Sequence, residues 1–168
     1  VIKIEPPPPP SEGGKNNDSM GGARHGFDFQ NLHRNKKSMT LNLKSLVGHA
    51  IFMKLAAKAD IIVENYRSDV KHRLKVDYDT VAKVNPRIIY CGAYGFGEGG
   101  RYAGKPALDD LIQGAVALPS LVGRVTGEPR YRPTNICDRT TGLPAVYAVT
   151  AALFARERDG QGQRVDIG

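Results

Sequence analysis

The chain has 168 residues, roughly the length of one domain, and its 40% hydrophobic content is enough for a buried core. The formal charge of +7 indicates an anionic partner, which would be a nucleic acid, an acidic membrane or a polyanionic small molecule. No apolar run approaches the roughly 20 residues that a membrane-spanning helix requires. The four His and two Cys have no metal-ligand spacing and make no disulfide framework, so we expect no bound metal and a reducing compartment.

A short strand pattern opens the chain and a long Pro/Gly-rich stretch follows it. Residues 1–5, VIKIE, are apolar and β-branched, which predicts a strand. In PPPPPSEGGKNNDSMGG the prolines favour polyproline II, and the remainder has too few apolar side chains to offset the entropy of ordering. We therefore expect a solvated Pro/Gly-rich loop over residues 6–37, and a proline-motif ligand for a partner module is the alternative.

The next segment predicts a strand, a helix and a second strand. SMTLNL, residues 38–43, alternates like a strand, and SLVGHAIFMKLAAKA presents apolar residues on one helical face with Ser45 as its N-cap. DIIVENY, residues 60–66, is typical of a buried strand. Because such a unit usually produces a parallel sheet, we expect an α/β fold.

The second half of the chain continues this alternation. VDYDTVAKVNP predicts a short helix that Pro86 stops, and RIIYCGAY predicts a third apolar strand. A helix is expected from residue 107 to about Pro119, a second one over residues 141–159, and a last strand at QRVDI. Along the second helix, one predicted apolar face consists of Leu143, Val146, Tyr147, Thr150, Ala151, Leu153 and Phe154.

The stretch GFGEGG, residues 95–100, matches the G-x-G-x-x-G pattern of dinucleotide-binding folds. In those folds the last glycine opens a helix at once, so that the pyrophosphate meets the helix N-terminus. Here RYAGKP intervenes, and Pro106 precedes the next helix. The stretch therefore favours a flexible glycine-rich loop, which can still border a ligand.

Basic residues form two clusters. One is HRNKKS, with Lys44 just beyond the next strand, and the other is RSDVKHRLK, directly after the strand IIVENY. Loops at the carboxyl ends of parallel strands are where α/β folds bind ligands, so the second cluster is a candidate for phosphate recognition. A solvated basic face is the alternative. Nucleic-acid binding predicts interleaved aromatic residues or a recognisable module, and Tyr66 is the only aromatic residue near the second cluster.

Cys137 and Asp138 lie where an apolar run meets the start of the long helix. We expect Cys137 to be a small apolar residue, because the nearest His in sequence, which a nucleophilic thiol would need as base, is His72. Asp138 has two interpretations. It could be an N-cap, or it could be a carboxylate that free helix N–H groups keep ionised and that attacks an activated acyl group. Residue chemistry alone leaves both open.

Six blocks of the sequence, taken in order, resemble the class III coenzyme A-transferase family. This family includes formyl-CoA, carnitine-CoA and succinyl-CoA-dependent transferases and the α-methylacyl-CoA racemases. The resemblance covers nearly the whole chain except the Pro-rich loop. It implies an internal fragment of a longer protein, a partial large CoA-binding domain over residues 1–168 without the first strand and the carboxyl-terminal part. The blocks are VIKIE, NKKSMTLNLK, AAKADIIVENYRSDVKHRL, NPRIIYCGAYGFGEGG, PALDDLIQGA and CDRTTGLPAVYAVTAALFARERDGQGQRVDI.

The resemblance implies a Rossmann-like parallel sheet with flanking helices, in a homodimer whose two chains are interlocked. It implies transfer of CoA from an acyl-CoA to a small carboxylic acid through enzyme-bound anhydride and thioester intermediates, with Asp138 as nucleophile. CoA is then a substrate, and no permanently bound cofactor is expected. Asp109 is expected to orient Asp138 or a water. The residues that match CoA-binding positions of the family are Leu41, Lys44, Asn65, Tyr66, Arg67 and Arg73.

Two departures from the family pattern bear on the reaction. Racemases of the family carry a His before the Asp of the PALDDL block, where this chain has Leu108, and proton transfer on both faces of a carbon needs two groups. The Pro run replaces a short Gly-rich loop. We therefore expect a cytoplasmic CoA-transferase (mitochondrial or peroxisomal in a eukaryote) with no membrane or nucleic-acid partner. An acyl-CoA racemase or epimerase, and a non-catalytic nucleic-acid-binding protein, are the alternatives.

Overall fold

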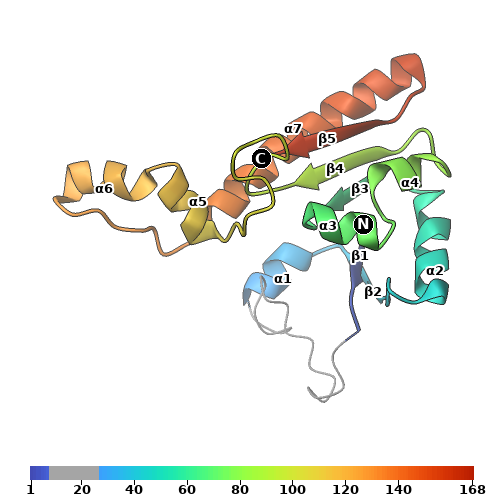
Figure 1. The fold of residues 1–168 in the computed structure, drawn as a ribbon, viewed down its shortest axis with the longest axis horizontal. Helices are drawn as coiled ribbons and strands as arrows, with labels where there is room; N and C mark the ends of the chain where they lie inside the picture. Colours follow the sequence, from blue (N-terminus) through green and yellow to red (C-terminus); the bar gives the residue numbers. More distant parts are fainter. Residues whose placement is uncertain (8–26) are drawn as a thin grey trace. The chain divides into compact units, whose positions relative to one another are not determined.

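The computed structural model describes residues 1–7 and 27–168 (Figure 1). The contacts divide the chain into two compact units, residues 1–54 and 55–168, and each unit is described by itself. Most of the predicted Pro/Gly-rich loop, residues 8–26, lies outside the described residues. Within the predicted loop of residues 6–37, the structure has one helix, α1 (Phe27–His33), in the part that it describes.

The first unit is built on a two-stranded parallel sheet. Strand β1 (Ile2–Glu5) pairs with β2 (Lys37–Thr40), so that Ile2 lies opposite Lys37 and Glu5 opposite Thr40. Helix α2 (Leu46–Ala56) then crosses the boundary between the units. The Ser45 hydroxyl accepts a hydrogen bond from the backbone N–H of Gly48 at 3.0 Å, which confirms the predicted N-cap.

The second unit contains a three-stranded parallel sheet in the order β3-β4-β5. Its strands are β3 (Ile61–Glu64), β4 (Ile89–Ala93) and β5 (Gln163–Ile167). The central strand is buried on both faces, since Ile89, Tyr90 and Cys91 are at most 1% exposed. The predicted α/β class is therefore confirmed, with parallel sheets and flanking helices.

Five helices of the second unit lie between its strands. The chain from β4 to β5 forms α5, α6 and α7 where one helix ending near Pro119 and one long helix were predicted. The prediction of one helix up to about Pro119 was wrong, because Ala117 has a left-handed conformation (φ 58°) and interrupts it. Pro119 lies in the first turn of a new helix, where its missing N–H has no cost. The five are α3 (Ser68–Arg73), α4 (Tyr78–Ala82), α5 (Asp109–Ala115), α6 (Leu118–Thr126) and α7 (Ile136–Asp159).

Helix α7 lies along β4 and β5 (Figure 1), but most of the predicted apolar face is not the side that it buries. The side chains of Tyr147 and Phe154 are 69% and 61% exposed, whereas the buried side carries Ala152 and Arg156. Arg156 Nη1 donates to the carbonyl oxygens of Asp60, before β3, and Arg87, before β4. The buried side of α7 is thus attached to the sheet through hydrogen bonds of Arg156 as well as through packing. Within the described residues, no helix has the length and apolar character needed to cross a bilayer.

Candidate active site

The carboxyl ends of the three parallel strands of the second unit lie at one edge of its sheet. The predicted residues Asn65, Tyr66 and Arg67 directly follow β3 at this edge, and Arg73 ends α3. A glycine-rich loop, residues 94–108, leaves β4 at the same edge and leads to α5. Ligands of open α/β sheets bind at such an edge, and the predicted residues Asn65, Tyr66 and Arg67 lie there.

Asp138 is the third residue of α7, and it is not the cap of that helix. The cap comes from Asp109, the first residue of α5. Its Oδ1 atom accepts hydrogen bonds from the backbone N–H groups of Cys137 at 2.7 Å and Asp138 at 3.1 Å. For the Asp138 carboxylate itself, the described residues supply no hydrogen bond or ion pair. The two predicted acidic residues are therefore neighbours in space with different roles.

Gln113, one turn after Asp109 on α5, fixes this arrangement and was missed by the sequence analysis. Its side chain is fully buried, and its Oε1 atom accepts from the backbone N–H of Arg132 at 2.9 Å. Its Nε2 atom donates to Asp109 Oδ2 at 2.7 Å and to the Arg132 carbonyl at 3.1 Å. The i, i+4 spacing of an acid and an amide on one helix was the available signal.

The environments of the two acids shift their pKa values in opposite directions. Burial and then the negative charge of Asp109 raise the pKa of Asp138. Burial would also raise the pKa of Asp109, but hydrogen bonds from Gln113 and from backbone N–H groups at the start of α7 outweigh it and lower that pKa. The expected stabilisation of the Asp138 carboxylate by free helix N–H groups is not observed, because the N–H groups of Cys137 and Asp138 donate to Asp109 instead.

Cys137 has no sign of nucleophilic activation. Burial and then the charges of Asp109 and Asp138 raise the pKa of its thiol, so the protonated form is favoured. A reactive cysteine needs the opposite, a thiolate stabilised by positive surroundings. Its half-buried position fits the predicted role as a small apolar residue.

The predicted CoA-binding residues of the second unit differ in exposure. Tyr66 is half-buried, and its backbone N–H donates to Glu64 Oε2 at 2.6 Å. Arg67 and Arg73 are about two-thirds exposed, and each lies 3.7 Å from an oxygen of Asp69. Exposed ion pairs of this length contribute little to stability, so Asp69 holds neither guanidinium group strongly, and Arg67 Nη2 also donates to the Gly104 carbonyl at 3.3 Å.

Leu41 and Lys44 belong to the first unit, so a common site with the residues above stays a prediction. Leu41 follows β2 and is buried, and its backbone N–H donates to the Glu5 carbonyl at 2.9 Å. Lys44 is exposed, and its backbone N–H donates to Asn42 Oδ1 at 3.0 Å. The first unit also has a pocket of about 350 Å³, lined by Lys3, Glu5, Phe29, Gln30, His33, Arg34, Lys36 and Ser38.

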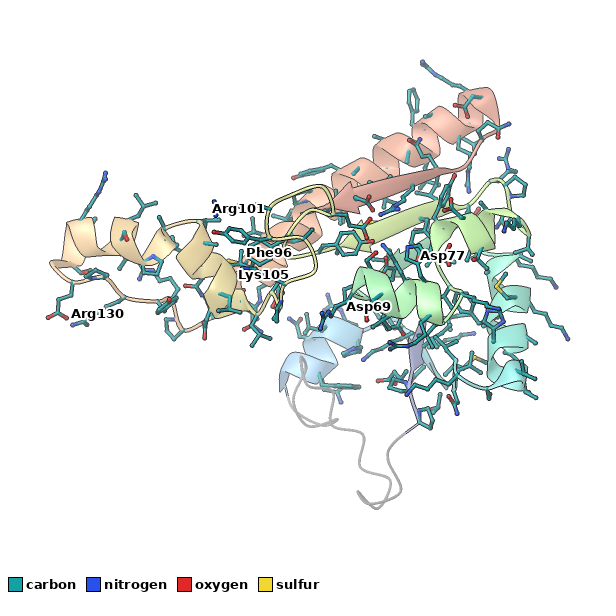
Figure 2. All side chains as sticks on the ribbon, viewed as in Figure 1. Asp69, Asp77, Phe96, Arg101, Lys105 and Arg130 are labelled. Atoms are coloured by element: carbon teal, nitrogen blue, oxygen red, sulfur yellow. The ribbon has the colours of Figure 1, made fainter. Side chains whose placement is uncertain are left out.

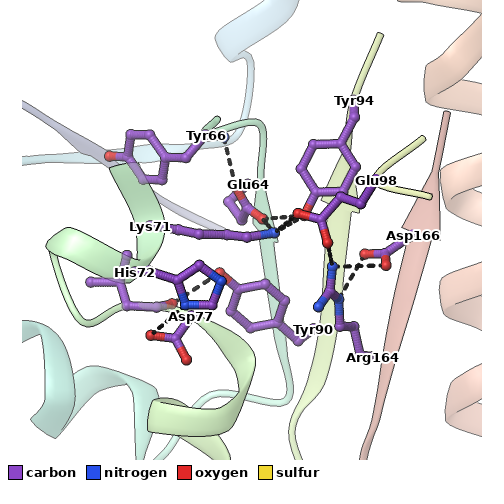
Figure 3. A network of polar contacts seen from close by, with 11 residues as sticks. Glu64, Tyr66, Lys71, His72, Asp77, Tyr90, Tyr94, Glu98, Arg164 and Asp166 are labelled. Carbon is purple, nitrogen blue, oxygen red and sulfur yellow. Dashed lines mark hydrogen bonds and ion pairs between the residues drawn. The ribbon is translucent and has the colours of Figure 1, made fainter. Parts of the chain in front are cut away.

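One residue of the second basic cluster is not available to a ligand. Lys71 is 1% exposed, and its ammonium group lies between Tyr94 and Glu98 (Figure 3).

The glycine-rich loop makes turns rather than a helix, with the Gly100 N–H donating to the Gly97 carbonyl at 3.0 Å. The loop thus lacks the helix N-terminus that a dinucleotide site requires. Figure 2 shows Phe96, Arg101 and Lys105 on this loop.

A family model and the curated relatives both identify the chain as a member of a CoA-transferase family. The model of "CoA-transferase family III" matches residues 1–168. The chain is 37% identical to an acetyl-CoA:oxalate CoA-transferase of Acetobacter aceti over 99% of its own length and 42% of the relative. It is 34% identical to a succinate–glutarate CoA-transferase of Agrobacterium fabrum over 80% of its length and 34% of the relative.

Solved structures give the same result. A CAIB/BAIF family protein from Brucella suis matches all of this chain and 45% of its own, with a TM-score of 0.86 and 30% identity. The D175A mutant of Rv3272 from Mycobacterium tuberculosis matches with a TM-score of 0.80 and 25% identity, again over 100% of this chain and 45% of that one. The chain therefore spans less than half the length of the relatives it matches.

Proposed function

Because the chain belongs to CoA-transferase family III, we propose that the protein transfers CoA from an acyl-CoA donor to a small carboxylic acid, with Asp138 as nucleophile. The observation that carries this proposal is the state of the Asp138 carboxylate. Its backbone is fixed by Asp109, while the described residues give its side chain no partner and raise its pKa. A more basic carboxylate is a stronger nucleophile as long as it stays ionised.

The reaction proceeds in four balanced steps. An Asp138 oxygen attacks the thioester carbonyl carbon of the donor, the C–S bond breaks, and a mixed anhydride and CoA thiolate form. The thiolate attacks the aspartyl carbonyl, releases the donor acid and leaves an aspartyl-CoA thioester. The acceptor carboxylate attacks this thioester, which gives a second anhydride and thiolate. Attack of the thiolate on the acceptor carbonyl then produces the new acyl-CoA and restores Asp138.

CoA carries a 3′-phosphate and a diphosphate, and exposed arginines suit these groups. Arg67 and Arg73 are assigned to the phosphates, because a guanidinium offers a planar fork of donors that fits a phosphate. Asn65 and Tyr66 are assigned to the adjoining part of CoA. Leu41 and Lys44, in the first unit, are assigned to CoA on the family pattern alone. This reading also accounts for the net charge of +7 without a nucleic acid.

The acceptor is proposed to be a short carboxylic acid. The names of the relatives include oxalate, succinate and glutarate, so short dicarboxylic acids form the first test panel. A racemase reaction is disfavoured because Leu108, the residue before α5, has no group that can carry a proton. As in the family pattern, the working form is proposed to be a homodimer.

Covalent trapping tests the nucleophile. The protein, with any sequence that naturally flanks residues 1–168, is incubated with an acyl-CoA and then with hydroxylamine, and the hydroxamate is mapped by mass spectrometry. Label at Asp138, and its loss together with activity in Asp138→Asn, supports the proposal. The matched control is Asp110→Asn, which changes an exposed acid in the first turn of α5 and should retain both. Turnover without label at Asp138 would exclude this nucleophile.

A further inference from the structure

A polar network at the carboxyl edge of the three-stranded sheet encloses one buried lysine (Figure 3). Lys71 Nζ lies 2.8 Å from Glu98 Oε1 and donates to the Tyr94 hydroxyl at 2.5 Å. The Tyr94 hydroxyl in turn donates to Glu64 Oε1 at 2.8 Å. A lysine this buried is retained only with close compensation, and Glu98 is its nearest carboxylate.

Glu98 connects this lysine to the opposite edge strand. Its second oxygen accepts a hydrogen bond from Arg164 of β5, and Arg164 is also paired with Asp166 at 2.9 Å. Burial would raise the pKa of Glu98, but Lys71 and Arg164 outweigh it and lower the pKa to about 2. One carboxylate of the glycine-rich loop is thus held by α3 and by β5, and it stays ionised at every physiological pH.

The glycine-rich loop is closed at its base and packed by its own side chains. Gly95 packs so tightly against Ala107 that a side chain at position 95 has no room. The rings of Phe96 and Tyr102 pack at a tilt of 55° with centroids 5.4 Å apart, and Arg67 Nη2 donates to the Gly104 carbonyl at 3.3 Å. A loop whose ends meet and whose side chains pack on each other is an Ω-loop, a class that is frequently functional.

The loop ends next to the residue that orients the proposed nucleophile. Leu108 is its last residue, and Asp109 is the first residue of α5. Asp109 directly follows the loop and accepts from the N–H groups of Cys137 and Asp138, so the chain joins the end of the loop to the start of α7 through one residue. Catalytic groups need placement to well under 1 Å, since a misplacement of about 1 Å can lower a rate about 100-fold.

We propose that Glu98 is a positioning residue, which fixes the glycine-rich loop to Lys71 and Arg164 so that Asp109 holds Asp138 in its reactive place. This inference rests on the proposed function of Asp138. It assigns Lys71 to the support of the loop rather than to phosphate binding. It also gives the GFGEGG stretch a role that depends on its one charged residue.

The test compares three variants of the protein with its natural flanking sequence. Glu98→Gln removes the charge but leaves Lys71 buried without its nearest carboxylate, so it can lose stability for that reason alone. Lys71→Met/Glu98→Gln removes both charges, keeps Arg164 paired with Asp166 and frees the loop. Glu128→Gln is the matched control, because it breaks an exposed pair with Arg130 of the same 2.8 Å length.

Three quantities are measured: the single-turnover rate of acylation at Asp138, the Kd of free CoA, and amide hydrogen exchange of residues 94–108. In the double variant we expect acylation to fall about 10- to 100-fold. Its Kd for CoA should stay within about 2-fold, and loop exchange should accelerate about 10-fold or more. Glu128→Gln should change none of these.

Acylation in the double variant within about 2-fold of the wild type would overturn the inference, as would an equal loss in Glu128→Gln. A loss that appears only as weaker CoA binding would also overturn it, because it would return Lys71 to the ligand site. The two proposals fail differently. If the wild type turns over without label at Asp138, the proposed function falls and this inference falls with it. If the wild type is labelled and the double variant is equally fast, only this inference falls.

Discussion

Replacing Asp109 by Asn changes one charge and almost no volume, so it tests the link between Asp109 and Asp138 directly. In the wild type, Oδ1 accepts two backbone N–H groups of α7 and Oδ2 accepts from Gln113 Nε2. Gln113 cannot turn its amide, because its Oε1 atom accepts from the backbone N–H of Arg132. In Asp109→Asn, a side-chain oxygen that faces the N–H groups of α7 leaves the new NH₂ group facing Gln113 Nε2. Two donors then face each other, and the hydrogen bond with Gln113 is lost.

The expected loss of stability follows from these contacts. Hydrogen bonds to a charged acceptor contribute about 1.5–3 kcal/mol each, against about 0.5–1.5 kcal/mol for neutral ones, and losing a helix cap costs about 0.5–2 kcal/mol. We expect Asp109→Asn to lower the free energy of unfolding by about 1–3 kcal/mol near neutral pH. Because the pKa of Asp109 is lowered on folding, its contribution exists above the unfolded value near 3.8 and disappears as the pH falls below it.

The decisive measurement is the pH dependence of acylation at Asp138. The charge of Asp109 is one of the two causes that raise the pKa of Asp138, so its removal should lower that pKa. The acid limb of the acylation rate should then move to lower pH, while the plateau falls about 10- to 100-fold from lost alignment. Single-turnover hydroxylamine trapping across pH 3–8 measures both, with Asp110→Asn as control. An acid limb that stays in place or moves upward would refute the electrostatic link.

Three further variants test other contacts. Asp138→Asn should abolish acylation without lowering the melting temperature, because a raised pKa means that the ionised carboxylate opposes folding above it; calorimetry that finds clear destabilisation contradicts this. Gln113→Leu should cost about 2–4 kcal/mol in urea unfolding by leaving the partners of a buried amide unpaired, and an unchanged midpoint would show that these bonds contribute nothing. Arg156→Met should cost about 1–3 kcal/mol, because the Asp60 carbonyl loses its donor, and hydrogen exchange in β3 should accelerate; slow exchange would argue against this role.

Local features of the fold could be predicted from the sequence because their causes are local. The apolar run RIIYCGAY predicted a third strand, which is β4, and its residues Ile89 to Cys91 are almost inaccessible to solvent. The N-cap at Ser45 and the stop after α7 at Gly160, which has a left-handed conformation, depend on neighbouring residues alone. Each of these predictions rests on interactions within a few positions of the chain.

The wrong or missed features depend on partners far away in sequence. Asp109 caps a helix that begins 27 positions later, so nothing near Asp138 in sequence reveals that its N–H groups are already occupied. The basic cluster after β3 was interpreted as a phosphate-binding site or a solvated basic face, yet its Lys71 is enclosed by Tyr94 and Glu98 of the glycine-rich loop. Periodicity detected an apolar stripe on α7 but could not tell which side packs on the sheet.

The paired acids also explain why a charge at the start of α7 is compatible with catalysis. Sites that separate the pKa values of two neighbouring acids assign them different roles. Here the Gln113 amide and the helix N–H groups all compensate Asp109, which therefore stays ionised and fixed. Asp138 receives none of this compensation among the described residues, and the charge beside it makes its carboxylate more basic. If Asp138 were only a structural cap, the donors would point to it, so their direction toward Asp109 favours Asp138 as the group that reacts.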